Sequence, residues 1–174
     1  MKILVVGGAG YIGSHMIKRF QSTEHQIEVL DNLSTGFEEN SQDYKFHLCD
    51  LSNKNQVHKI LKENKYEMIM HFASSINVGE SYDHPIKYYE NNVTNTLNLL
   101  ECMIDLKILN FIFSSTAAVY GEPKSIPIKE EQNLTPINPY GKTKSVVENI
   151  LSDYDKSYGL KYISLRYFNA CGAH

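Results

Sequence analysis

The sequence predicts an α/β fold with a doubly wound parallel β-sheet. Short runs of aliphatic and β-branched residues recur along the chain, as expected of strands that are buried on both faces. Segments in which apolar residues recur at helical spacing lie between most of these runs. A strand, a helix and a second strand in this order form a right-handed crossover, which makes the strands parallel and places helices on both faces of the sheet.

Six runs are expected to form the strands, and each is interpreted as buried. They are residues 3–6, 27–30, 44–48, 66–72, 110–113 and 161–165. The helical segments are residues 12–20, 56–61 with its flanks, 88–103 and 140–158.

Local signals support the helix boundaries. Residues 53–55 offer asparagine caps for the second helix. Pro139 can occupy the first turn of the last helix, where its missing N–H costs nothing. Residues 121–139 hold four of the five prolines and show no apolar period, so a surface loop is expected there.

Length and composition indicate one ordinary globular domain. A chain of 174 residues can bury about two-thirds of its unfolded-state surface. Apolar residues make up 42% and charged residues 21%, with a formal net charge of −3. This balance gives no electrostatic reason to expect a nucleic acid or a membrane surface as partner. No internal repeat or low-complexity segment interrupts the chain.

The cysteines and histidines give no sign of a metal site. Cys49, Cys102 and Cys171 are odd in number and widely spaced, so neither a disulfide framework nor a zinc site is expected. The seven histidines are scattered singly. Reduced thiols favour the cytoplasm. The apolar run at 3–6 is too short for a signal-peptide core, and no stretch approaches the length of a membrane span.

Three glycines follow the first strand and open the first helix, in the run GGAGYIG. Gly7 permits a tight turn, Gly10 lets a ligand approach the backbone, and Gly13 lets the helix pack closely on the strand. The helix N-terminus then offers free N–H groups and a partial positive charge to a pyrophosphate. A tight turn without a ligand is the alternative, because the motif alone is weakly specific.

Carboxylates end the next two strands. Asp31 lies about 18 residues beyond Gly13, where a carboxylate accepts hydrogen bonds from an adenosine ribose. It would repel a 2′-phosphate, so a Rossmann fold that binds NAD rather than NADP is expected. Asp50 lies at the same sheet edge, and either an adenine contact or a helix cap explains it equally well. The small residues after Phe72 fit either a close backbone approach to a ligand or loop packing.

Tyr140 and Lys144 are spaced i and i+4, so both project from one face of the last helix. In the structural interpretation, Tyr140 is a partly exposed aromatic residue and Lys144 is a solvated lysine. The functional interpretation is a tyrosine base, whose pKa would have to fall from about 10 to near neutrality, a change of roughly 4 kcal/mol. A neighbouring ammonium and a positively charged nicotinamide ring could supply this together. A hydroxyl from Thr116 or Ser115 could complete the proton-transfer site.

Seven motifs together resemble the extended short-chain dehydrogenase/reductase family, and within it the sugar-nucleotide 4-epimerases. They are GGAGYIG, the DN pair at 31–32, HFA at 71–73, YYENNV at 88–93, SSTAAVYGEP, NPYGKTK and RYFNACGAH. They stand in the family's order along the whole chain, and as a set they are highly specific.

The resemblance implies a role for each matching residue. Residues for the cofactor NAD would be Gly7, Gly10, Tyr11, Ile12, Gly13, Asp31, Asn32, Asp50, Leu51, Phe72, Ala73, Asn91, Ser115, Tyr140, Lys144 and Phe168. The catalytic residues would be the base Tyr140, its partner Lys144 and the hydroxyl of Thr116. The UDP-sugar would be bound by Thr116, Tyr140 and Asn169.

The implied reaction is NAD-dependent 4-epimerisation of a UDP-hexose through a 4-keto sugar. Dehydratases of the family carry an Asp-Glu pair after the threonine, where this chain has Ala117 and Ala118, which counts against dehydration. Ile76 stands where many relatives have a lysine near the cofactor, so one charged contact is expected to be missing.

Family members are nearly twice as long as this chain. Residues 1–174 are therefore expected to be an NAD-binding domain that stops before the substrate-binding portion, with weak or absent epimerase activity alone. An NAD-binding module without turnover is the alternative. The resemblance also suggests a homodimer, to which segments 84–103 and 140–158 could contribute, although an apolar helix face belongs to the core just as often.

Overall fold

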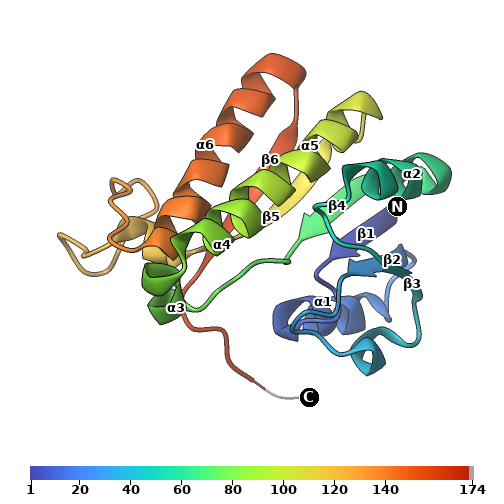
Figure 1. Ribbon diagram of the computed structural model, residues 1–174, viewed down its shortest axis with the longest axis horizontal. Helices are drawn as coiled ribbons and strands as arrows, with labels where there is room; N and C mark the ends of the chain where they lie inside the picture. The colour runs from blue at the N-terminus through green and yellow to red at the C-terminus, as the bar shows by residue number, and fades with distance from the viewer. Residues whose placement is uncertain (173–174) are drawn as a thin grey trace.

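The computed structural model describes residues 1–172, and its centre is a parallel sheet with the strand order β3-β2-β1-β4-β5-β6 (Figure 1). The predicted doubly wound sheet is confirmed. The strands of this sheet are β1 (Lys2–Val6), β2 (Gln26–Asp31), β3 (Lys45–Leu48), β4 (Met68–His71), β5 (Asn110–Thr116) and β6 (Lys161–Tyr167). The strand order reverses between β1 and β4, and ligands of such sheets bind at this switch point, beyond the carboxyl ends of the strands.

Helices connect the strands. The α-helices are α1 (Tyr11–Phe20), α2 (Lys54–Asn64), α3 (Val78–Asp83), α4 (Pro85–Tyr89), α5 (Asn95–Asp105) and α6 (Pro139–Tyr158). Short 3-10 turns occupy Glu38–Ser41 and Ala117–Tyr120, and a π-helical turn occupies Glu90–Thr94. In the described part of the chain, no helix combines the length and the apolar character needed to cross a bilayer.

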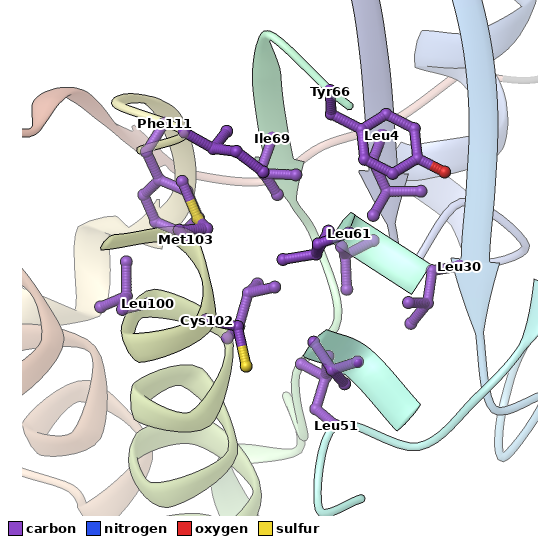
Figure 2. Packing of buried hydrophobic residues seen from close by; sticks show 14 of the residues in the cluster. Leu4, Leu30, Leu51, Leu61, Tyr66, Ile69, Leu100, Cys102, Met103 and Phe111 are labelled. Carbon is purple, nitrogen blue, oxygen red and sulfur yellow. The ribbon is translucent and has the colours of Figure 1, made fainter. Parts of the chain in front are cut away.

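Alternating residues of the strands feed two apolar clusters, one on each face of the sheet. Leu4 of β1 packs in the larger cluster, together with residues of α2, α5 and α6. Figure 2 shows Leu61 of α2 and Met103 of α5 pointing into this cluster beside Ile69 of β4. Ile3, the neighbour of Leu4, packs on the opposite face in the smaller cluster, which α1 covers. The period-2 alternation of a strand therefore divides the core into two layers.

The sequence predicts that all six strands are buried, but two of them are partly exposed. The edge strand β3 is partly exposed along its length. The other edge strand, β6, leaves Ile163 56% exposed. Both strands have a neighbour on one side only, and α1 packs against the central strand β1. The expectation of full burial was wrong at these two positions because it considered each apolar run without its place in the sheet.

The expected helix over 88–103 was also wrong in part. It begins earlier, with Pro85 in the first turn of α4, and the π-helical turn at Glu90–Thr94 separates α4 from α5. The short helix α3 was not predicted, and Asn77 caps it by accepting a hydrogen bond from the Glu80 N–H at 3.1 Å. A π-turn inserts one residue into a helix and is common at functional sites.

The caps of the other long helices follow the sequence signals. Asn53 caps α2 by accepting the Gln56 N–H at 3.1 Å. Asn138 caps α6 by accepting the Gly141 N–H at 2.7 Å, with Pro139 at the first helical position. The 121–138 segment before α6 is a loop, as expected. This loop and its cap fix where α6 begins, and therefore where Tyr140 lies.

Candidate functional site

A cleft of about 1020 Å³ lies at the carboxyl ends of the strands. It runs from the turn after β1 to the first turn of α6. Every residue that the sequence analysis assigned to a site lines this one cleft. These residues are Gly7, Gly10, Tyr11, Ile12, Gly13, Asp31, Asn32, Asp50, Leu51, Phe72, Ala73, Asn91, Ser115, Thr116, Tyr140, Lys144, Phe168 and Asn169.

The glycines between β1 and α1 differ in what requires them. Gly7 has a φ of +80°, a conformation that L side chains rarely adopt. A Cβ at Gly13 would lie 2.2 Å from the Gly7 carbonyl oxygen, so close packing of α1 excludes any side chain there. At Gly10 the nearest protein atom would be 3.4 Å away, an ordinary contact. The fold therefore requires glycine at positions 7 and 13, whereas at position 10 glycine leaves space in the cleft.

The first turn of α1 offers hydrogen-bond donors beside this space. The N-cap residue of α1 is Gly10, which has no side chain that could accept a hydrogen bond from this turn. The N–H groups of a first helical turn have no acceptor within the helix. Together with the small Gly10, they form a place where anionic oxygens can approach the backbone.

The strand-end carboxylates are held by protein donors. Asp31 is 8% exposed, and its carboxylate accepts the N–H groups of Ala9 at 3.0 Å and Leu33 at 2.9 Å. Asp31 therefore joins the end of β2 to the glycine turn. The Asp31 side chain therefore lies between the glycine turn after β1 and the end of the neighbouring strand β3.

Asp50 does not cap a helix, because Asn53 caps α2. Its carboxylate accepts the Ser52 N–H at 2.8 Å and the Asn32 side-chain amide at 2.6 Å. These hydrogen bonds, from Ser52 and then Asn32, lower the pKa of Asp50. The capping alternative for Asp50 is therefore excluded.

Lys144 is buried, so the interpretation as a solvated lysine is wrong. Its side chain projects from α6 into the sheet, the residue is 2% exposed, and the ammonium donates to the Ser114 carbonyl at 2.8 Å. The ammonium also lies 4.7 Å from the centre of the Phe113 ring. Burial lowers the pKa of Lys144 to about 7, although the charge of Glu148 acts in the opposite direction.

Tyr140 lies at the start of α6, next to Thr116. Burial raises the pKa of Tyr140, and a hydrogen bond with the Thr116 side chain opposes this rise. The lowered pKa expected from a neighbouring ammonium is not found in the protein alone. The physical reason is that burial favours the neutral phenol, while the Lys144 ammonium is directed to the Ser114 carbonyl.

Of the two hydroxyls considered for proton transfer, Thr116 is the one available to Tyr140. Ser115 donates its hydroxyl proton to Glu148 at 2.5 Å, and Glu148 forms an ion pair with Arg166 at 2.7 Å. The Thr116 hydroxyl oxygen accepts the Ala118 N–H at 3.2 Å, which leaves its proton free to be donated. Ser115 thus lines the cleft but is engaged in the ion pair behind it.

The sequence analysis missed a buried clamp that involves Asn92. This residue is 2% exposed and lies in the π-helical turn. Its amide accepts the Ser75 N–H at 2.8 Å and donates to the Ser75 carbonyl at 3.0 Å and the Thr143 hydroxyl at 3.1 Å. The Thr143 hydroxyl in turn donates to the Tyr140 carbonyl at 2.7 Å. The clamp joins the loop after β4 to the turn of α6 that carries Tyr140. In the sequence, the one available sign of this clamp is that Asn92 directly follows Asn91, a residue already assigned to the site.

The segment after β6 completes the far side of the cleft. Phe168 is exposed and Asn169 follows it, both lining the cleft. The Tyr11 hydroxyl donates to the Gly172 carbonyl at 2.5 Å, which ties this segment back to the glycine turn. Within residues 1–172, no group of three or more His, Cys, Asp or Glu side chains is arranged to hold a metal ion.

The chain matches the model of the NAD dependent epimerase/dehydratase family over residues 3–174. It is 47% identical over 174 residues to a UDP-glucose 4-epimerase from Lactobacillus helveticus, covering 99% of this chain and 53% of that protein.

Among solved structures, it is similar to the UDP-glucose 4-epimerase from Brucella ovis in complex with NAD. The TM-score is 0.97 at 43% identity, covering 99% of this chain and 53% of that one. It is also similar to the UDP-Glc/GlcNAc 4-epimerase from Campylobacter jejuni, with a TM-score of 0.94 at 46% identity, covering 98% of this chain and 55% of that one. The chain spans about half the length of the relatives it matches.

Proposed function

This chain belongs to the NAD dependent epimerase/dehydratase family, and we propose that it carries the NAD site and the catalytic residues of a UDP-hexose 4-epimerase. One observation supports this most strongly. A single cleft contains both the glycine turn at one end and Tyr140, Thr116 and Lys144 at the other. We interpret residues 1–174 as the nucleotide-binding half of such an enzyme, since the chain spans only half of its relatives.

The residues of the cleft fit NAD. The pyrophosphate would lie on the first turn of α1, where Gly10 leaves space and the N–H groups of Tyr11 and Ile12 are free of intrahelical acceptors. Asp31 and Asn32 would bind the adenosine ribose, with Asp50 and Leu51 at the adenine. The remaining contacts on the way to the nicotinamide would come from Phe72, Ala73, Asn91, Ser115, Lys144 and Phe168.

The catalytic step assigned to this chain is a proton transfer at the Tyr140 hydroxyl. The phenolate would take the proton of the sugar 4-hydroxyl, held in place by the hydroxyl of Thr116. When bound, NAD would supply reversible hydride transfer at sugar C4 and a positively charged nicotinamide ring. That charge would supply what the protein alone lacks, because burial raises the pKa of Tyr140.

Lys144 would support this step electrostatically. Its buried ammonium lies beneath the cleft on the same helix face as Tyr140, and a positive charge there stabilises a phenolate. Asn169 would contact the UDP-sugar together with Thr116 and Tyr140. Dehydration is disfavoured, because Ala117 and Ala118 line the cleft after Thr116 and neither can act as an acid or base.

Two further properties belong to this proposal. An NAD-binding module without turnover is the second candidate, supported by the half-length match.

We also propose a homodimer. It is supported by exposed apolar residues on the segments expected to form it, Ile86 and Tyr89 before α5 and Val146 on α6.

Two measurements test the proposal. Calorimetric titration should show binding of NAD in preference to NADP, and preference for NADP would contradict the role of Asp31. A coupled assay of UDP-galactose conversion should show weak or no turnover by the chain alone. Turnover that is lost in Tyr140→Phe but kept in Tyr158→Phe, a matched change at the exposed end of α6, would establish the epimerase chemistry and disprove the expected inactivity.

A further inference from the structure

The charged side chains that line the cleft differ in whether protein groups already bind them. Among the described residues that line it, Asp31, Asp50 and Glu80 are acidic, and Lys87 and Lys144 are basic. Protein donors already bind the two aspartates, and the Lys144 ammonium is buried against the Ser114 carbonyl. Of the lining residues that the structure describes, Lys87 alone presents an exposed ammonium, with 55% of its side chain accessible.

Glu80 holds the Lys87 ammonium at the edge of the cleft. The two charged groups are 2.6 Å apart. Glu80 is itself fixed, because its other carboxylate oxygen accepts the Tyr88 hydroxyl at 2.8 Å and its N–H donates to Asn77. Tyr88 is fully buried. An ordinary surface ion pair joins two freely moving side chains, whereas here one partner is anchored to the core.

Lys87 lies at the Tyr140 end of the cleft. The helices α3 and α4, which carry Glu80 and Lys87, both pack against α6. Figure 1 shows α3 and α4 beside α6 and separate from α1, at the glycine turn. Burial raises the pKa of Tyr88 to about 12, with Glu80 and the nearby Tyr140 phenol adding to the shift. Lys87 is therefore far from the place proposed for the NAD pyrophosphate.

We propose that Lys87, presented by Glu80, is a binding residue for the nucleotide at the Tyr140 end of the cleft, where its ammonium donates to hydroxyl or phosphate oxygens. This inference rests on the proposed function. The oxygens can come from the nicotinamide-side half of NAD or from the second nucleotide, the UDP-sugar. The ion pair with Glu80 leaves the ammonium two further donors for a ligand.

The test compares nucleotide binding by Lys87→Met, Glu80→Gln and Lys62→Met. Lys62 is an exposed lysine of α2, outside the cleft, and serves as the matched control. NAD is titrated into each protein by calorimetry, and UDP into each NAD-saturated protein. Thermal unfolding of each variant verifies that it is folded.

Lys87→Met should weaken binding of NAD about fivefold, the ratio expected when one exposed charge-assisted hydrogen bond is lost. Lys62→Met should leave the affinity unchanged. Glu80→Gln should not weaken binding, because the glutamine carbonyl can still accept a hydrogen bond from the Lys87 ammonium, while a competing negative charge is gone. A loss of UDP affinity with unchanged NAD affinity in Lys87→Met would also support the proposal and would identify the second nucleotide as the source of the oxygens.

Two results would overturn the inference alone. One is unchanged affinity for both nucleotides in Lys87→Met. The other is an equal loss in Glu80→Gln and Lys87→Met, which would show that the ion pair acts through structure. If the unsubstituted chain fails to bind NAD, the proposed function is overturned as well, so the two failures are distinguishable.

Discussion

The two ends of the cleft are built by different means. At the glycine turn, backbone sterics and backbone hydrogen bonds fix most of the geometry. The φ of Gly7, the close contact at Gly13 and the hydrogen bond from the Gly7 N–H to the Leu30 carbonyl show this, and Asp31 adds one side-chain acceptor for the Ala9 N–H. At the Tyr140 end, buried polar side chains fix it, through Asn92, Thr143 and Lys144. In the proposed function, the backbone-built end binds a constant cofactor group, and the end built from buried side chains holds the group that changes its protonation state.

The largest expected effect is a loss of stability, caused by a substitution at the glycine-turn end of the cleft. Gly13→Ala should lower the free energy of unfolding by about 2–4 kcal/mol, because its Cβ would collide with the Gly7 carbonyl and the backbone must shift. Gly10→Ala should lower stability by no more than about 1 kcal/mol, because alanine is a poorer N-cap than glycine, but it should reduce NAD affinity about tenfold or more. Urea unfolding and calorimetry separate the two quantities. Full NAD affinity in Gly10→Ala would mean that the turn is not a pyrophosphate site.

At the other end, Asn92→Ala should lower the free energy of unfolding by about 1–3 kcal/mol. It removes the hydrogen bonds to the partly buried Ser75 backbone and to the buried Thr143 hydroxyl. The effect should be confined to the Tyr140 end. Hydrogen exchange should speed up in the first turn of α6 and in Glu90–Thr94, while α1 keeps its protection. Faster exchange throughout the sheet would show that the clamp supports the whole fold instead of positioning Tyr140.

An effect that is smaller per pH unit should come from Lys144. Its pKa is about 7 in the folded protein, below the 10.5 of an unperturbed lysine. The unfolded chain therefore binds more protons between these values, and stability rises with pH through this window by about 1.4 kcal/mol per pH unit at most. Lys144→Met should remove this slope. Equal pH dependence of unfolding in both proteins, from pH 7 to 10, would show that the lysine is not buried as an amine.

The two ends also differ in how well sequence predicts them. The order of apolar runs and the glycine spacing depend on local sterics, and they gave the sheet, α1 and the strand-end carboxylates correctly. The clamp of Asn92, the burial of Lys144 and the occupation of the Ser115 hydroxyl by Glu148 depend on contacts between residues far apart in the chain. No periodicity encodes such contacts. The π-turn and the exposed faces of β3 and β6 were missed for the same reason.

In the proposed function, the Tyr140 phenol faces the reactive end of a nucleotide bound at the glycine turn. The most direct measurement is the ionisation curve of Tyr140, taken as the phenolate absorbance of the unsubstituted chain minus that of Tyr140→Phe, with and without saturating NAD. We expect the pKa to lie above its usual value without NAD and to fall when the positively charged nicotinamide binds beside it. Identical curves with and without NAD, in a chain shown by calorimetry to be saturated, would contradict the claim.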